Sequence, residues 1–212
     1  MNGNSRPHRT LGARESYLER GKYLVAARLV QPYYLGYATA LHHYGYTERR
    51  PPSVYVATTV RKQALTVMGV HYRFVTLSLH KFFGFTQTTV AGQPVTFSGR
   101  EKTVTDCLDR PDLAGGAVEA AKALWFGQEE VDVEQVIACA RRMGNRSILR
   151  RLGFWLERLE LGSPALLETL EDRLSHSYVK LDTRGPAAGP RHPRWRVIVN
   201  VPEKQLLEWR EH

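Results

Sequence analysis

The sequence predicts an α+β fold in which a small, mostly antiparallel sheet packs against a bundle of about five to six helices. Residues 54–98 are rich in β-branched and aromatic side chains with near alternation, a pattern typical of strands. Between residues 101 and 174, apolar side chains recur every three or four positions, as in amphipathic helices. Strands and helices are thus segregated along the chain, which favours α+β over alternating βαβ units.

The N-terminal segments are less regular. Residues 1–16 show no apolar periodicity, and we expect a frayed tail there. Residues 17–29 turn at Gly21 into a short apolar run, which we interpret as a strand or hairpin arm. In residues 31–45, aromatic and aliphatic side chains at helical spacing predict a half-buried helix that Gly45 ends.

Four segments in the middle of the chain have the composition of strands. They are residues 54–59, 71–78, 85–90 and 94–98. The short connection Ala91, Gly92 and Gln93 predicts that the last two form an antiparallel hairpin.

The helical part begins after the last of these strands. Ser98 and Glu101 have the spacing of a capping box, and Pro111 should end the helix that it starts. Four further helices are predicted at residues 117–126, 133–143, 148–161 and 163–174. We expect the sheet to share a core with this bundle. The expected core residues are Val104, Cys107, Val136, Ile137, Trp155 and Leu156.

Two strand-like segments close the chain. Residues 178–182 and 195–201 are apolar and partly β-branched, whereas residues 184–194 between them are rich in Gly, Pro and Arg. The second composition suits neither a helix nor a buried strand, so we expect a flexible loop.

Composition excludes several protein classes. Hydrophobic residues make up 42% of the 212 positions, which argues against disorder and fibres. Every apolar stretch is far shorter than the roughly 20 residues that span a bilayer. The polar, basic N-terminus is not followed by the apolar region of a signal peptide, so we expect no secretory signal. Cys107 and Cys139 are the only two cysteines, so a disulfide framework is not expected and a reducing, cytoplasmic setting fits.

Charge is distributed unevenly along the chain. Residues 1–100 hold 13 Lys and Arg against three Asp and Glu, residues 101–140 hold three against nine, and residues 141–212 hold 14 against nine. Charges separated by more than about 8 Å are largely screened in physiological salt, so each block acts locally. The pattern indicates a surface for a polyanion and a separate surface for another partner, although a solvated basic surface without a partner would look the same.

Basic residues of the first block are the candidates for contact with operator or non-specific DNA. They are Arg14, Arg20, Lys22, Arg28, Arg49, Arg50, Arg61 and Lys62. Candidates for a protein partner come from the acidic block and from an arginine row expected on one helix face. They are Glu129, Glu130, Asp132 and Glu134, and Arg142, Arg146 and Arg150.

The sequence lacks the usual motifs of four enzyme classes, namely G-x-S-x-G, G-x-x-x-x-G-K-[ST], H-E-x-x-H and C-x-x-C. His42 and His43 are adjacent and point about 100° apart on a helix, so we expect no metal there and no cofactor. A metal-dependent nuclease would need paired carboxylates. Structural roles fit the available ones better: Glu101, Asp106, Asp109 and Asp112.

Five blocks in order resemble the C-terminal domain of the AbiEi-type antitoxins of type IV, abortive-infection toxin–antitoxin systems. They are RGKYLV (20–25), PYYLGYATALHHYG (32–45), EKTVTDCLDRPDLAGG (101–116), RRLGFWLERL (150–159) and WRVIVNVP (195–202). The third is the most specific of the five.

The resemblance implies a function in phage defence. Members of this family are similar in neutralising a nucleotidyltransferase-like toxin encoded beside them and in repressing their own operon. It implies an antitoxin domain over residues 21–212, preceded in residues 1–20 by a tail or the remnant of an upstream winged helix-turn-helix. The chain is then not an enzyme and has no membrane partner. The alternative is a nuclease or nucleotidyltransferase-related enzyme, which metal-dependent turnover of nucleic acid would reveal.

Overall fold

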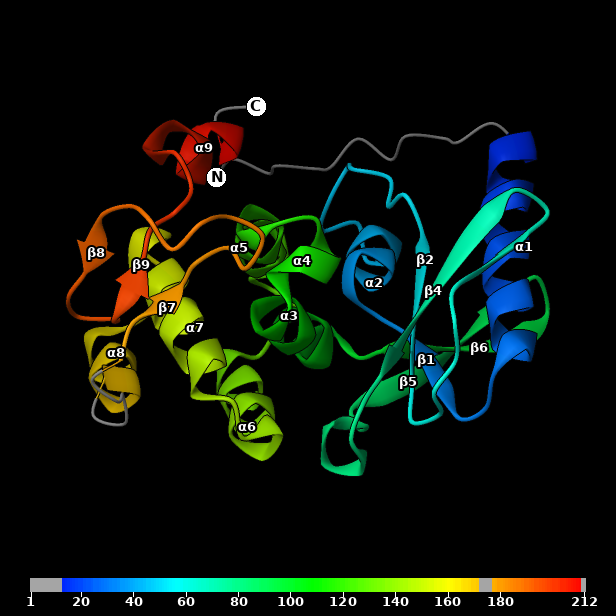
Figure 1. Ribbon diagram of the computed structural model, residues 1–212, viewed down its shortest axis with the longest axis horizontal. Coiled ribbons are helices and arrows are strands. Elements are labelled where there is room, and N and C mark those ends of the chain that lie inside the picture. The colour runs from blue at the N-terminus through cyan, green and yellow to red at the C-terminus, as the bar shows by residue number, and fades with distance from the viewer. Residues whose placement is uncertain (1–12, 172–176, 211–212) are drawn as a thin grey trace.

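The computed structural model describes residues 13–171 and 177–210, with side chains from residue 20 onward. The elements form two neighbouring parts along the long axis of Figure 1. One part, which we call the sheet lobe, contains a six-stranded sheet with helices α1 and α2. The other, the helical lobe, contains the remaining α-helices and a three-stranded sheet. The fold is therefore α+β, as predicted.

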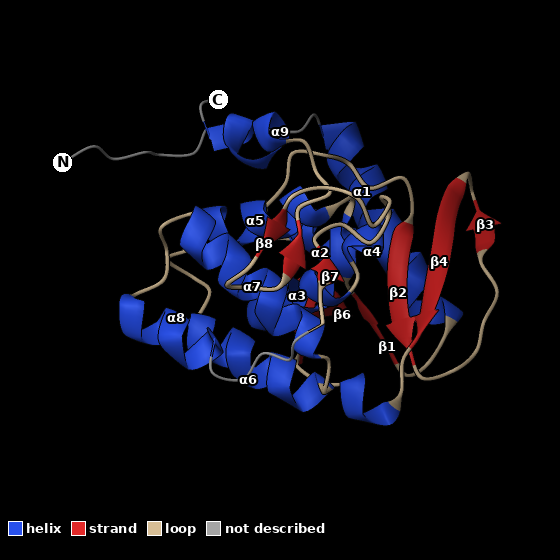
Figure 2. Ribbon diagram, turned by 60° about the vertical axis from the view of Figure 1, so that its left-hand side comes forward, coloured by secondary structure: helices blue, strands red, loops and turns tan. Residues whose placement is uncertain are grey.

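The six-stranded sheet has the order β3-β4-β2-β1-β6-β5. Its strands are β1 (Tyr33–Leu35), β2 (Val54–Thr58), β3 (Leu65–Val67), β4 (Val70–Thr76), β5 (Phe85–Val90) and β6 (Gln93–Ser98). The sheet is mixed: three of its five strand pairs are antiparallel, but β2 pairs parallel with β4 and β1 pairs parallel with β6. For β2 and β4 the physical reason is β3, a short strand that the sequence did not predict. After β2 the chain forms β3 at the edge of the sheet and then reverses direction. Strand β4 therefore lies between β3 and β2 and runs parallel to β2 (Figure 2).

The predicted hairpin is confirmed. Strands β5 and β6 pair antiparallel from Phe85 opposite Ser98 to Val90 opposite Gln93. At its tip, Ala91 and Gly92 have φ angles of 48° and 76°. Two consecutive positive φ values are typical of the tight turns that match strand twist.

Residues 17–29 are not a strand. They belong to helix α1 (Ala13–Leu29), which runs through Gly21 without a turn. Tyr23 and Ala26 lie three residues apart on its inner face, and both are buried against the sheet. The strand prediction was wrong because the short apolar run contains this helical spacing, and burial of one face outweighs the cost of about 1 kcal/mol for glycine in a helix.

The helix expected at residues 31–45 is shorter. Its first residues join the sheet as β1, and helix α2 spans Tyr37–His43. Gly45 has a φ of 71° just beyond it, in agreement with the predicted helix end. Helix α2 packs on the sheet face opposite α1, where Tyr34, Tyr37 and Tyr55 are buried together.

Six helices of the helical lobe comprise the five predicted ones and one more. They are α3 (Arg100–Asp109), α4 (Pro111–Ala114), α5 (Ala117–Phe126), α6 (Val133–Met143), α7 (Arg146–Arg158) and α8 (Pro164–Glu171). As predicted, α3 ends before Pro111, which then begins the unpredicted α4. The last predicted helix extended to residue 174, and residues 172–174 lie outside the described part.

The capping box at Ser98 is not formed. The residue that precedes α3 is Gly99, and no side chain caps that helix. The Ser98 hydroxyl instead hydrogen-bonds Thr103 Oγ1 at 2.7 Å, and Glu101 accepts from the backbone N–H of Asp132 at 3.4 Å. Both side chains therefore bind within the fold rather than to the helix end.

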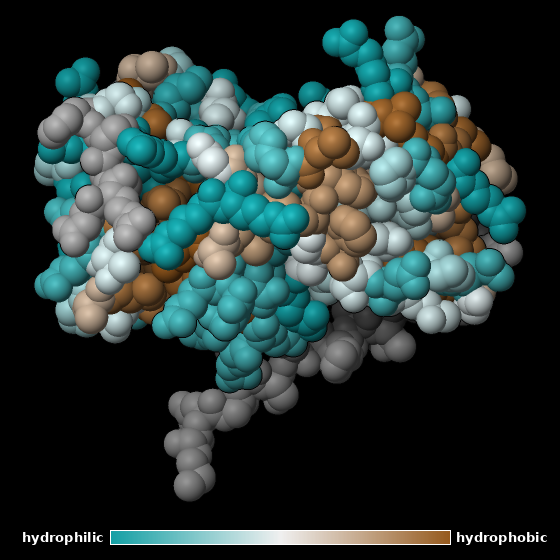
Figure 3. All heavy atoms as spheres, turned by 90° about the horizontal axis from the view of Figure 1, so that it is seen from below, coloured by the Kyte–Doolittle hydropathy of each residue, from teal (hydrophilic) through white to brown (hydrophobic). Residues whose placement is uncertain are grey.

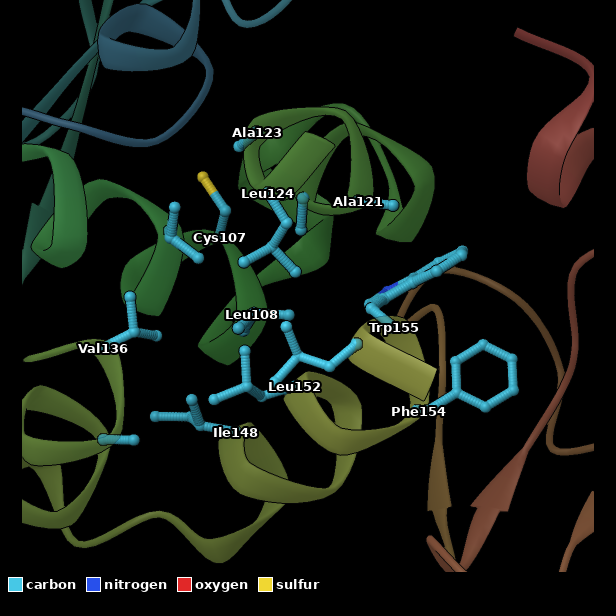
Figure 4. Packing of buried hydrophobic residues seen from close by; sticks show 14 of the residues in the cluster. Cys107, Leu108, Ala121, Ala123, Leu124, Val136, Ile148, Leu152, Phe154 and Trp155 are labelled. Carbon is cyan, nitrogen blue, oxygen red and sulfur yellow. The ribbon is translucent and has the colours of Figure 1, made fainter. Parts of the chain in front are cut away.

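The six predicted core residues are buried, each at most 4% exposed. Figure 4 shows residues of α3, α5, α6 and α7 pointing toward one another in this cluster, including Cys107, Val136, Leu152 and Trp155. The sheet, however, has separate apolar clusters on its two faces. Packing between the lobes runs largely through α2, which contacts α3 and α4.

Three short strands form the second sheet: β7 (Val179–Lys180), β8 (Arg191–His192) and β9 (Val197–Ile198). The two predicted closing strands are thus present, but β8 lies inside the segment expected to be a flexible loop. Trp195, fully buried, anchors it on α7 at Gly153. A Cβ at Gly153 would lie 2.2 Å from the Trp195 ring, so the close approach requires glycine.

Three short helical turns complete the described chain: η1 (Leu79–Lys81), α9 (Glu203–Leu207) and η2 (Glu208–Arg210). Within residues 13–171 and 177–210, no helix is both long and apolar enough to cross a bilayer.

Candidate nucleic-acid and partner interfaces

The predicted basic residues divide between two places. Five of them lie on α1 or in the connection after β2, and we call these two segments the α1 surface: Arg20, Lys22, Arg28, Arg61 and Lys62. The Thr58 hydroxyl donates to the carbonyl of Pro32 at 2.7 Å, which holds the end of β2 beside the end of α1. Arg28, in the last turn of α1, and Arg61, three residues after the end of β2, are both exposed.

Aromatic rings support the two lysines of this surface. Lys62 Nζ lies 5.5 Å from the centroid of the Phe74 ring, and Lys22 Nζ lies 5.1 Å from that of Tyr23. Such contacts hold a cation near the protein while leaving it accessible to an anion. The side chain of Arg14 lies outside the described part of the structure.

Arg49 and Arg50 precede β2, so they lie at the opposite end of that strand from Arg61. Both are exposed, and Arg49 Nη1 donates to the carbonyl of Gly115 at 3.3 Å. The structure therefore does not bring all the predicted DNA-binding residues into one patch.

A cleft of about 540 Å³ lies beside Arg49, at the start of α5. Its charges are satisfied within the protein: the Asp182 carboxylate accepts from the N–H of Ala117 at 3.1 Å and pairs with Arg184 at 2.8 Å. Burial alone would raise the pKa of Asp182. Hydrogen bonds from the Arg184 side chain and from two backbone N–H groups outweigh this effect, and the pKa is lowered. The carboxylate thus already caps α5, and it occupies the place where an anion would bind.

The acidic candidates surround the turn between α5 and α6. Glu130 pairs with Arg100 at 3.2 Å and accepts from the Tyr46 hydroxyl. Asp132 caps α6 by accepting from the N–H groups of Glu134 and Gln135 at 2.9 and 3.2 Å. These two carboxylates have structural roles, whereas the side chains of Glu129 and Glu134 are exposed.

The arginine row is not on one helix, because Gly144 ends α6 in the left-handed conformation. Arg142 lies on α6 with its guanidinium 3.9 Å from the centroid of Phe83, and Arg146 begins α7; both are exposed. Arg150 is only 2% exposed. The prediction of an arginine row on one helix face, open to a partner, is wrong for this residue, because α7 contacts α3, α6, α8 and β9 and so has little free surface.

Figure 3 shows the face on which α6 and η1 lie. Strongly hydrophilic atoms adjoin hydrophobic ones near its middle, and no uniform apolar face is present there. Leu79 of η1 is 80% exposed.

Carboxylates that a nuclease would need are engaged in the fold. Asp106 pairs with Lys102, and Asp109 pairs with Lys81 at 3.0 Å. Asp112 accepts two hydrogen bonds from Arg110, which lower its pKa. Among the described residues, no group of three or more His, Cys, Asp or Glu side chains has the arrangement of a metal site.

Arg191 and Arg196 were not among the predicted site residues. Their guanidinium groups lie 5.2 and 5.8 Å from the centroid of the Tyr178 ring. The segment RHPRWR (191–196) carries a signal for such a site, since it interleaves arginine with an aromatic residue, but its Pro and Arg content suggested only a loop.

No family model matches the chain, and no curated protein matches it. Among solved structures, it is similar to the crystal structure of the RV2827C protein from Mycobacterium tuberculosis, with a TM-score of 0.62 and 16% sequence identity. The match covers 93% of this chain and 71% of that one. At this identity the likeness shows that the two share a fold.

Proposed function

We propose that the chain is a binding protein, the antitoxin of a type IV toxin–antitoxin system, that neutralises a nucleotidyltransferase-like toxin and contacts DNA in autoregulation. The five sequence blocks support the antitoxin assignment. One observation carries the DNA contact: residues 20–100 hold ten Lys and Arg but a single carboxylate, Glu48. Nucleic-acid backbones bind such surfaces through their phosphates.

The α1 surface is the part of the sheet lobe that fits DNA best. Arg28 and Arg61 are exposed at the ends of α1 and β2, which the Thr58–Pro32 hydrogen bond joins, and Lys62 is supported by Phe74. Between residues 20 and 100 the one carboxylate, Glu48, precedes β2 and so lies at the opposite end of that strand from Arg61. A surface of this kind contacts the backbone and reads little sequence, so we propose weak binding without strong sequence preference.

For the toxin, we propose contact with the exposed carboxylates Glu129 and Glu134. They lie in the only acidic block of the chain, and a toxin that handles nucleic acid needs a basic groove. Arg142 and Arg146 would instead meet an acidic toxin surface. Charge reversal distinguishes the two proposals. If the carboxylates contact the toxin, reversing them should abolish neutralisation; if the arginines do, reversing the arginines should.

Neutralisation as proposed needs no catalytic step by this chain. Asp106, Asp109 and Asp112 hold positions in the fold through Lys102, Lys81 and Arg110. We place the protein in the cytoplasm, where both proposed partners occur. Cys107 and Cys139 are free thiols, in keeping with a reducing compartment.

The experiment for the DNA contact is duplex binding followed across salt concentrations. Replacing Arg28 and Arg61 by Ala should lower the slope of log K against log salt by up to about 1.8, or 0.9 for each lost phosphate contact. The control replaces Arg158 and Lys204 by Ala, since both pair with carboxylates in the other lobe. An unchanged slope in the first variant removes the α1 surface, and no binding at low salt removes the DNA contact.

A further inference from the structure

Two guanidinium groups meet at one aromatic ring in the small sheet. Arg191 of β8 and Arg196 of the turn before β9 both lie over the ring of Tyr178, at 5.2 and 5.8 Å from its centroid. Arg196 is held there in a left-handed conformation, with a φ of 53°, which non-glycine residues adopt at an energetic cost. The backbone of this turn is therefore fixed in a form that places the arginine at the ring.

Helix α7 adds two more cations. The Arg150 side chain donates from Nη1 and Nη2 to the hydroxyl of Ser177 at 3.4 and 3.3 Å, next to Tyr178 in the chain. Burial, followed by the positive charges of Arg146 and Arg196, lowers the pKa of Arg150. The four arginines thus converge from α7, β8 and the following turn. We call them, with Tyr178, the Tyr178 cluster.

Three of the carboxylates on neighbouring elements bind other arginines. Glu157 and Glu171 pair with Arg194, at 3.5 and 2.8 Å, and Glu203 pairs with Arg158. In the part of the chain that the structure describes, Arg146, Arg191 and Arg196 form no ion pair with a carboxylate. The like charges of the cluster repel one another, and an anion bound among them would remove that cost.

We propose that the Tyr178 cluster is a second nucleic-acid site, which binds the phosphates of a single strand and stacks a base on or beside the tyrosine. Guanidinium groups bind phosphate oxygens in pairs of parallel hydrogen bonds, and several of them suit a ligand that carries a phosphate at every residue. The aromatic ring favours a strand with accessible bases over an acidic peptide, which has no aromatic ring to stack.

The site is distinct from the α1 surface. Figure 1 places β7, β8 and β9 at one end of the long axis and α1 at the other. The inference therefore does not depend on the antitoxin assignment, and loss of one site leaves the other in place. A chain with both sites can contact two segments of nucleic acid at once.

The test uses the full chain and a fluorescent 20-nucleotide single strand, with anisotropy measured from 50 to 200 mM salt. The variant Arg191→Gln with Arg196→Gln should lower the slope of log K against log salt by about 1.4 and weaken binding about 20-fold at 0.1 M salt. The matched control is Arg158→Gln with Arg194→Gln, which removes the same charge from arginines that have carboxylate partners. It should change the slope by less than half as much.

Three results would overturn the proposal. The first is an unchanged slope in the Arg191 and Arg196 variant, and the second is an equal loss in both variants, which would indicate net charge alone. The third comes from competition with a 20-residue poly-glutamate. If it displaces the strand as well as unlabelled oligonucleotide does, the cluster binds acidic peptides instead. Arg150 is left unchanged in these variants because it is buried.

Discussion

The ammonium group of Lys102 and the carboxylate of Asp106 form an ion pair, one helical turn apart on α3, that is enclosed where the sheet lobe meets the helical lobe. Each side chain is only 1% exposed. The Tyr34 hydroxyl of β1 joins the pair, donating to Asp106 at 2.8 Å and accepting from Lys102 at 3.1 Å. Burial, with the charge of Asp106, raises the pKa of Tyr34, so the hydroxyl stays protonated and keeps donating. The most specific sequence block therefore joins the two lobes.

Removing one partner of this pair should be costly. In Lys102→Met the Asp106 carboxylate would stay buried without its cation, and we expect the free energy of unfolding to fall by about 3–5 kcal/mol. Urea denaturation of the variant and the parent protein measures this difference in the free energy of unfolding. The double variant Lys102→Met with Asp106→Leu should recover most of the loss, because no buried charge remains. A loss below about 1 kcal/mol in the single variant would contradict the enclosed ion pair.

Trp155 should be among the most sensitive core positions. It is fully buried between α7 and its neighbours (Figure 4), so Trp155→Ala should cost about 3–5 kcal/mol in chemical denaturation. Phe126→Ala is the matched control, because that ring is 40% exposed and its loss should matter much less. Equal losses in the two variants would show that Trp155 is not enclosed.

Stability should depend on pH through His43. Burial, followed by the charges of Arg100 and His42, lowers the pKa of His43 from 6.5 to about 4. Between these values the unfolded chain binds a proton that the folded chain does not, so the free energy of unfolding falls as pH drops from 6.5 to 4. The loss from this one group is on the order of 2–3 kcal/mol.

The variant His43→Phe isolates this effect. Its ring can keep the stacked contact with Phe97, whose centroid lies 3.8 Å from that of His43, but it cannot be protonated. Denaturation midpoints between pH 4 and 7 should therefore vary less in the variant than in the parent protein. His80→Gln, at an exposed position, should leave the parent profile unchanged. A profile for His43→Phe that follows the parent would refute this role.

Periodicity predicted the elements whose neighbours are local. The helices at residues 117–126 and 133–143 and the hairpin of β5 and β6 follow directly from spacing and turn residues. Helix α1 was missed because its inward face, with Tyr23 and Ala26, is recognisable only once the sheet it covers is known. The parallel pairing of β2 with β4 is likewise a consequence of β3, which is too short to give a pattern of its own.

The candidate sites were predicted less well than the fold, because they depend on contacts between distant residues. Sequence spacing grouped Arg150 with Arg142 and Arg146, yet packing around α7 buries Arg150 and brings it beside Ser177. Arg191 and Arg196 join it only because Trp195 anchors their turn at Gly153. The acidic block was recognisable by composition, but hydrogen bonds alone distinguish the capping Asp132 from the exposed Glu129.

The proposed toxin contact predicts which charges matter for neutralisation. Reversing the exposed carboxylates, Glu129→Lys with Glu134→Lys, should weaken rescue more than reversing Arg49 and Arg61 to Glu. Glu130 and Asp132 are left unchanged because they hold Arg100 and the start of α6. Growth is compared at matched protein levels. A larger effect of the basic pair would exclude these two carboxylates as the toxin contact.

The most direct measurement is growth of cells that express the proposed partner, a nucleotidyltransferase-like toxin, with and without this protein. An antitoxin should restore growth to near the toxin-free rate, and the fold-disrupting variant Lys102→Met should fail to do so. If the intact protein, at levels confirmed by immunoblot, leaves the cells arrested, the chain is not the antitoxin of that toxin.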